Sequence, residues 1–222
     1  MDRKWSLIIL CVALVFSITG CGKKRGPGNA GGEDPVCPVV PSPSSDPITE
    51  ERVLFSFEQG TNGFDVPEWF REKPENAAVR IGVSKKYSSE GSQSLEVESN
   101  FPGQIWSASM VELEQYLDLT PYRQISVDVL APRAAPMGLK AKIILTIGDQ
   151  WKWTEMICSV PLAPGEWATV NASVEPGSMS WKRTEVGESF RSDIRKIVVR
   201  VESNKSPIYK GPVYIDNIRV GR

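Results

Sequence analysis

Short runs of β-branched and aromatic residues recur throughout residues 50–222, and Gly, Pro, Ser and Asn separate them. Apolar and polar positions alternate within several runs, as in a β-strand with one buried face. The helical period is nearly absent, apart from one helical turn expected in each of two segments, 67–76 and 187–193. The pattern predicts strands over 53–58, 78–83, 94–98, 104–113, 124–130, 140–147, 151–160, 166–172, 196–202 and 213–220.

Alternation also assigns an inward face to the three most regular strands. The residues expected inward are Ile125, Val127 and Val129; Ala141, Ile143, Leu145 and Ile147; and Ile197, Val199 and Val201. One buried and one wetter face per strand is typical of antiparallel sheets. About ten strands with long loops fit a jelly roll better than an immunoglobulin domain. The predicted fold class of residues 50–222 is therefore all-β, an antiparallel β-sandwich jelly roll.

The predicted strand 151–160 carries candidate binding chemistry. If Met156 continues into the core, Trp151, Trp153 and Glu155 point to the opposite face. Large exposed aromatic side chains mark binding surfaces, and a flat indole suits the C–H face of a sugar ring. Glu155 and Lys142, expected on the same face, are candidates for contacts with sugar hydroxyls. The alternative is that one of the two tryptophans packs beneath a covering loop.

Residues 1–20 are interpreted as a lipoprotein signal peptide. Two basic residues precede an apolar run, which is shorter than a bilayer-spanning helix requires. The closing tetrapeptide ITGC (18–21) resembles a bacterial lipobox, so Cys21 is the expected site of lipidation. A plain secretory signal with an incidental cysteine is the alternative. Gly22 follows Cys21, and no Asp is present there to mark inner-membrane retention, so the outer membrane or cell surface is the expected location.

Residues 21–49 are expected to form a disordered tether, because they are rich in Gly, Pro and Ser and poor in aliphatic residues. Cys37 lies in this tether, and Cys158 lies in the predicted sandwich. A free Cys37 with Cys158 buried as a small hydrophobe is preferred here over a disulfide between them.

Composition excludes several functional classes. The 222 residues contain no His, which rules out a His-containing triad or a His-ligated zinc within this chain. Lys+Arg at 26 against Asp+Glu at 27 gives a net charge of -1, without the basic excess of a nucleic-acid-binding protein. No nucleic-acid partner is therefore expected.

Several segments together resemble the galactose-binding-like carbohydrate-binding modules, above all the module attached to bacterial β-mannanases. They are FSFEQGTNGF (55–64), YSSEGSQSL (87–95), DLTPY (118–122), ISVDV (125–129) and VYIDNI (213–218). The resemblance spans nearly all of 52–220. It implies a noncatalytic jelly roll that binds β-linked polysaccharide, with mannan as the family's suggestion. The family's modules usually accompany a catalytic domain and this chain contains none, so partner glycosidases are implied.

The resemblance also implies a structural Ca²⁺. Matched by motif, Glu58 and Asp216 would supply carboxylates, with oxygen atoms around Ser88 and Gly91 completing the cage. Ca²⁺ takes six to eight oxygen ligands, and the first and last strands of a jelly roll can lie side by side. The alternative is that both carboxylates are solvated or paired with nearby cations.

Two other functions stay open. Exposed tryptophans serve protein interfaces as well as sugars, so an envelope lipoprotein that binds an assembly or secretion factor is the main alternative. A glycoside hydrolase needs two carboxylates at a defined separation, but no such pair stands out in the sequence. The sequence therefore predicts a lipid-anchored, noncatalytic protein of the cell envelope.

Overall fold

The computed structural model describes residues 46–222. The signal peptide, Cys21, Cys37 and most of the expected tether lie outside the described residues. The last tether residues, 46–49, are described, and they contact the C-terminal strand: the Thr49 N–H donates to the Arg222 carbonyl at 2.8 Å. In the described part of the chain, no helix combines the length and the apolar character needed to cross a membrane.

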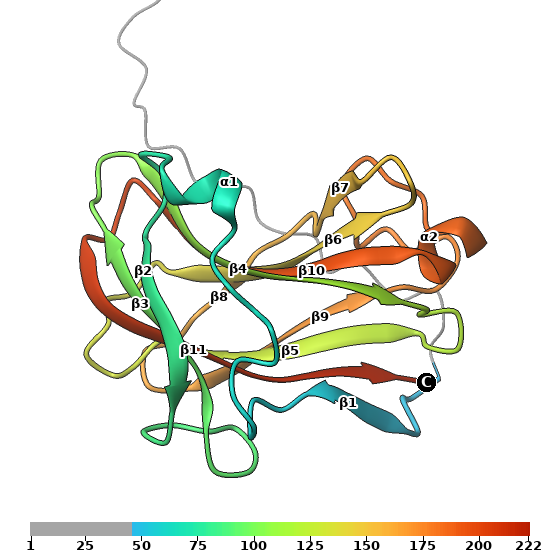
Figure 1. Ribbon diagram of the computed structural model, residues 1–222, viewed down its shortest axis with the longest axis horizontal. Helices are drawn as coiled ribbons and strands as arrows, with labels where there is room; N and C mark the ends of the chain where they lie inside the picture. Colours follow the sequence, from blue (N-terminus) through green and yellow to red (C-terminus); the bar gives the residue numbers. More distant parts are fainter. Residues whose placement is uncertain (1–45) are drawn as a thin grey trace, which may run out of the picture. The chain divides into compact units, whose positions relative to one another are not determined.

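Two antiparallel sheets lie face to face (Figure 1). The first sheet has the order β2 (Ala78–Ser84), β3 (Ser94–Phe101), β11 (Tyr209–Gly221), β5 (Gln124–Leu130), β9 (Trp167–Ser173), and β1 (Glu51–Phe55) pairs with the end of β11. The second has the order β4 (Trp106–Leu117), β10 (Ile194–Asn204), β6 (Lys140–Ile147), β7 (Lys152–Glu155), and β8 (Val160–Pro161) pairs with β6. The predicted all-β sandwich is confirmed.

The core lies between the two sheets, and the residues expected inward from alternation are all buried in it. The two most regular strands, β5 and β6, have the predicted bounds. They are well predicted because apolar residues occupy every second position, which fixes both the strand and the face that it buries. The helical turns expected in 67–76 and 187–193 are α1 (Glu68–Arg71) and α2 (Glu188–Ser192).

The second sheet also buries a small apolar group on its outer face, the face that points away from the core. Phe70 from α1 packs there and is only 5% exposed. It covers Ala108, Met110, Ile144 and Val198, which come from the three longest strands of the sheet. Phe70 and the backbone bridges on either side of α1, Asp65 with Glu112 and Asn76 with Ala108, thus fix α1 over this face (Figure 1). The same short helix carries Trp69, which is exposed.

Two sequence predictions are wrong in this region. The single strand expected over 151–160 is two short strands, because the chain leaves the β6 pairing after Glu155 and Met156 forms a bridge with Trp181. Trp151 therefore lies in the turn before β7, with a φ of 52°. Cys158 is disulfide-bonded and not a free buried thiol.

Candidate functional site

Two tryptophans meet on the outer face of the second sheet. Trp153 from β7 and Trp69 from α1 have ring centres 5.6 Å apart and stand edge to face at 89°. Their exposed fractions are 40% and 50%. Alternation in β7 sends Trp153 outward, while the next residue, Thr154, is fully buried. The Trp69 ring thus supports the Trp153 ring from one side and leaves a large part of it exposed to solvent.

An ion pair between Lys196 and Glu112 connects a third tryptophan, Trp151, to the same region. Lys196 of β10 contacts Glu112 of β4 at 3.1 Å, and its Nζ lies 5.6 Å from the centre of the Trp151 ring. The Trp69 indole N–H donates to the other oxygen of Glu112 at 3.4 Å. The turn position of Trp151 therefore does not remove it from the predicted face. We call Trp69, Trp151 and Trp153 the tryptophan group.

Beside the tryptophan group, Glu155 is surrounded by cations. Its carboxylate lies 2.7 Å from Arg200, 3.0 Å from Lys182 and 3.6 Å from Lys142. Burial opposes ionisation of Glu155, but the Lys182 hydrogen bond and the three positive charges prevail and lower its pKa. Burial lowers the pKa of Lys142, which lies almost wholly beneath the surface. The two residues predicted to contact hydroxyls are thus in one ionic cluster, which also holds Glu202 at 3.0 Å from Arg200.

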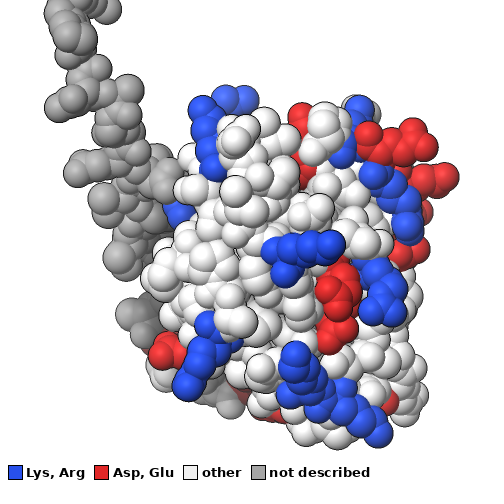
Figure 2. All heavy atoms as spheres, turned by 90° about the vertical axis from the view of Figure 1, so that its left-hand side faces the viewer, with Lys and Arg blue, Asp and Glu red and all other residues white. Residues whose placement is uncertain are grey.

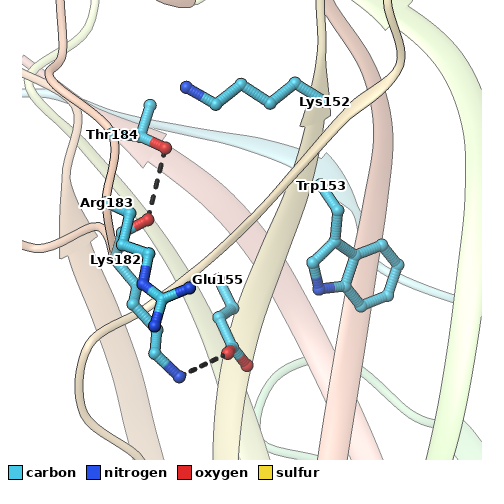
Figure 3. A pocket seen from close by; sticks show the side chains of 6 residues that line it. All are labelled: Lys152, Trp153, Glu155, Lys182, Arg183 and Thr184. Atoms are coloured by element: carbon cyan, nitrogen blue, oxygen red, sulfur yellow. Dashed lines mark hydrogen bonds and ion pairs between the residues drawn. The ribbon is translucent and has the colours of Figure 1, made fainter. Parts of the chain in front are cut away.

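An open cavity lies along the free edge of β7. Its volume is about 330 Å³, and its lining is Lys152, Trp153, Glu155, Lys182, Arg183 and Thr184. Figure 3 shows Trp153 on one side of the strand and the Lys152, Lys182 and Arg183 side chains on the other. Residues 182–184 form the outer wall of the cavity. A hydrogen bond holds them beside β7, in which the Lys182 N–H donates to the Glu155 carbonyl at 2.9 Å.

The structure thus brings all four predicted ligand-contacting residues to one region and adds three that sequence reasoning did not assign. Trp69, Lys182 and Arg183 come from segments distant in sequence from β7. For Trp69, the signal in the sequence was the position of a tryptophan within an expected helical turn. No local pattern marked Lys182 and Arg183, since their position depends on the bridge between Met156 and Trp181.

The residues predicted to bind Ca²⁺ gather around one loop, 88–93, which they hold by hydrogen bonds. One Glu58 oxygen accepts the Ser92 and Gln93 N–H groups at 2.9 and 3.1 Å, and the other accepts the Ser92 hydroxyl at 2.6 Å. These hydrogen bonds lower the pKa of Glu58, and the bond from the Ser92 hydroxyl has the largest effect. Gly91 has a φ of 66°, and a Cβ there would lie 2.5 Å from a Glu58 oxygen. The Ser88 hydroxyl donates to the Gly91 carbonyl at 3.4 Å.

Asp216 holds the other side of the same loop. It is 1% exposed and accepts N–H groups from Ser89 at 2.8 Å, Glu90 at 3.3 Å and Asn217 at 2.7 Å. Its burial nevertheless raises its pKa. The loop thus turns donors toward both carboxylates, whereas a Ca²⁺ cage needs acceptors. Within residues 46–222, no group of three or more acidic, His or Cys side chains is placed to hold a metal. Ca²⁺ binding stays a prediction that this donor set does not favour.

Comparison with solved structures identifies carbohydrate-binding modules of the same fold. The module CBM27-1 of Caldicellulosiruptor saccharolyticus, solved with mannohexaose, has a TM-score of 0.53 and 19% identity; the match covers 77% of this chain and 96% of that one. CBM28, described as specific for non-crystalline cellulose, has a TM-score of 0.53 and 17% identity over 79% of this chain and 96% of its own. No family model and no curated protein sequence matches the chain. At these identities, the similarity establishes the fold, which is the fold that the sequence motifs implied.

Proposed function

We propose that this protein is a noncatalytic polysaccharide-binding protein, and that a β-linked glycan lies on the outer face of the second sheet against Trp153. The observation that carries the proposal is the position of Trp153: braced by Trp69, 40% exposed, and bordering a cavity rich in hydrogen-bonding groups. An indole face stacks on sugar C–H groups, while charged and hydroxyl side chains nearby bond the sugar hydroxyls. A flat apolar surface without such groups would favour a protein partner instead.

The same arrangement supports binding in preference to catalysis. A glycosidase needs a carboxylic acid with a raised pKa to protonate the leaving group. Glu155 is the carboxylate nearest Trp153 in the cavity, and its surrounding cations lower its pKa. Glu112, the carboxylate beside Trp69, is engaged by Lys196. The lowered pKa of Glu155 does not suit a general acid, and Glu112 is held in an ion pair, so we assign hydrolysis of the bound polymer to partner glycosidases.

The location of the protein is proposed from the sequence. A signal peptide over residues 1–20, followed directly by Cys21, implies a lipid anchor in the cell envelope, on the outer membrane or the cell surface. The disulfide at Cys158 supports export, because disulfides persist in oxidising compartments outside the cytoplasm. Among neutral polysaccharides, we propose mannan as the ligand, because the module of similar fold described above was solved with mannohexaose.

The proposal is tested by affinity electrophoresis of the full chain through gels containing galactomannan, glucomannan, xylan, β-glucan or soluble cellulose derivatives. We expect retardation in at least one gel. Trp153→Ala should weaken that retardation at least about tenfold, as the loss of a central aromatic contact does in other binding sites. Val79→Ala is the matched control, because Val79 is 69% exposed on β2 of the other sheet.

The melting temperature of each variant shows whether it is folded. Trp153 and Val79 are both exposed, so both variants should retain a cooperative transition near that of the wild type. Equal retardation of wild type and folded Trp153→Ala would remove Trp153 from the site. If a folded wild type is retarded in no gel, and does not bind acidic polysaccharides either, the protein-binding alternative takes the place of the glycan proposal.

A further inference from the structure

The lining of the β7 cavity carries an excess of positive charge. Three of its six residues, Lys152, Lys182 and Arg183, are cations, and Glu155 is its one acid. The Glu155 charge is already met by three cations, of which only Lys182 lines the cavity. Among the described residues, neither Lys152 nor Arg183 contacts a carboxylate. The cavity thus presents two uncompensated cations on a chain whose net charge is -1, so this positive character is local.

The backbone at Arg183 allows its side chain to be tested separately from the fold. Arg183 has a φ of 54°, in the left-handed region that glycine adopts freely and that other residues adopt at a cost in free energy. The neighbouring residues hold it there: the Lys182 N–H bonds the Glu155 carbonyl at 2.9 Å, and the hydroxyls of Thr154 and Thr184 lie 3.4 Å apart. Replacement by glycine therefore removes the guanidinium and suits the backbone.

The cavity therefore joins two kinds of recognition. Trp153 offers an aromatic face for a sugar ring, and Lys152 and Arg183 offer positive charge on the other side of the strand, in the lining of the same cavity (Figure 3). An arginine guanidinium pairs with a carboxylate through two parallel hydrogen bonds, and a lysine adds a point charge. The oxygens of a neutral mannan can accept hydrogen bonds from both cations, but they carry no negative charge to pair with them.

We infer that the preferred ligand is an acidic polysaccharide, a β-linked polyuronide that stacks one ring on Trp153 and crosses the edge of β7, so that the carboxylate of a neighbouring ring pairs with Arg183 and Lys152. The inference rests on the proposed function, since it requires a glycan on this face, and it adds the class of sugar. It replaces the neutral mannan of the family resemblance with a sugar that carries a carboxylate.

Two matched ligands test the inference. Hexamers of β-1,4-linked mannose and of β-1,4-linked mannuronate differ only in the group at C6, a hydroxymethyl in one and a carboxylate in the other. We would measure the affinity of the full chain for each by calorimetry. We expect the mannuronate hexamer to bind at least about tenfold more tightly near 50 mM salt, and this advantage to shrink near 500 mM salt because ions screen exposed charges.

Three variants separate the two kinds of recognition. Arg183→Gly should remove most of the preference for mannuronate and leave the melting temperature unchanged or higher, since glycine suits the backbone there. A purely structural arginine would instead lower the melting temperature when replaced. Lys152→Gln should reduce the preference less. The double variant R80Q/K210Q is the control, because it removes one Arg and one Lys from exposed positions on the first sheet and should change nothing.

The outcomes are distinguishable. Equal or tighter binding of the mannose hexamer would overturn the acidic-ligand inference and leave the proposed glycan-binding function in place. Binding of neither the hexamers nor the neutral polymers, by a protein shown to be folded, would overturn both. A sulfated polymer such as dextran sulfate that binds as tightly as the mannuronate hexamer, and is equally weakened by Arg183→Gly, would overturn the assignment to uronates.

Discussion

At the scale of single residues, Glu155 decides much of the chemistry of the outer face. It lies among Lys142, Lys182 and Arg200, and two of these partners are almost wholly buried. Burial of a lysine without a counter-charge is costly, so the carboxylate makes the buried position of Lys142 tolerable. The same carboxylate orients the side chain of Lys182 at the wall of the cavity.

Glu155→Gln should therefore lower the free energy of unfolding by about 1–3 kcal/mol at neutral pH, since it removes the carboxylate that Lys142, Lys182 and Arg200 share and leaves Glu202 as the remaining acid of the cluster. The folded-state pKa of Glu155 lies below its ordinary value, so the folded state binds the proton more weakly than the unfolded chain does. Its stabilisation is present above the ordinary pKa of glutamate and is lost as the pH falls through the lowered value.

Thermal unfolding of wild type and Glu155→Gln from pH 7 to pH 3 measures this effect. The difference between the two melting temperatures should narrow as the pH falls. Protonation of Glu155 removes from the wild type the ion-pair stabilisation that the variant already lacks. Glu98→Gln, on the first sheet, controls for the general loss of a negative charge. A difference that stays constant with pH would show that the ion pairs do not stabilise the fold.

Asp216 provides a second residue-scale prediction. Asp216→Ala removes the acceptor for three backbone N–H groups and should lower the free energy of unfolding by about 2–4 kcal/mol. From the donors present, we expect that loss to be the same in chelator and in Ca²⁺. A melting temperature that Ca²⁺ raises in the wild type but not in Asp216→Ala would instead establish the cage predicted from Glu58, Asp216, Ser88 and Gly91.

At the scale of elements, α1 depends on its contact with the second sheet. It has only four residues, too few for a helix to be stable alone, so its position rests on the packing of Phe70 and on the backbone bridges that flank it. These contacts place Trp69 against Trp153. The tryptophan group is thus assembled by tertiary packing.

Phe70→Ala should lower the free energy of unfolding by about 3–4 kcal/mol, because it leaves a cavity over Met110, Ile144 and Val198. It should also weaken glycan binding, although Phe70 itself is buried and out of reach of the ligand. Phe70→Leu, which fills most of the same space, should restore both properties in large part. Normal affinity in folded Phe70→Ala would show that the packing of Phe70 is not needed to position Trp69 and Trp153.

The sequence predicted what local patterns determine and missed what distant pairing determines. Strands β5 and β6 were found at their bounds because each alternates over its whole length. Strand β7 was predicted too long, because its pairing ends where Met156 meets Trp181, a contact with no local signal. For the site, Trp153 and Glu155 followed from alternation, whereas Arg183 and the ring contact of Trp69 follow only from the folded chain.

At the scale of the whole molecule, charge and apolar surface are unevenly distributed. Figure 2 shows white surface between separate groups of charged side chains on the side of the sandwich that lies to the left in Figure 1. Ile208 is 72% exposed in the turn before β11, and Gly103 comes close to it, since a Cβ there would lie 2.5 Å from the Ile208 side chain. The surface around Ile208 is the one to examine if the protein-binding alternative is correct.

The proposed anchor also belongs to this scale, although Cys21 lies outside the described residues. Cys21→Ser should release the protein from the membrane fraction into the soluble fraction, because it removes the thiol that would carry the lipid. Immunoblotting of both fractions provides the measurement, and glycan binding by the released protein should equal that of the wild type. Continued association of Cys21→Ser with membranes would contradict the lipobox interpretation.

The pairing of β1 with β11 has one practical consequence. The Arg222 N–H donates to the Glu50 carbonyl at 3.0 Å, so the two ends of the described chain run side by side at one edge of the first sheet. Neighbouring strands are about 5 Å apart, a span that a surface loop of a host protein can bridge without distortion. Residues 46–222 are thus suited to insertion as a whole into another protein, and the tryptophan group, on the opposite sheet, would remain free to bind the proposed glycan.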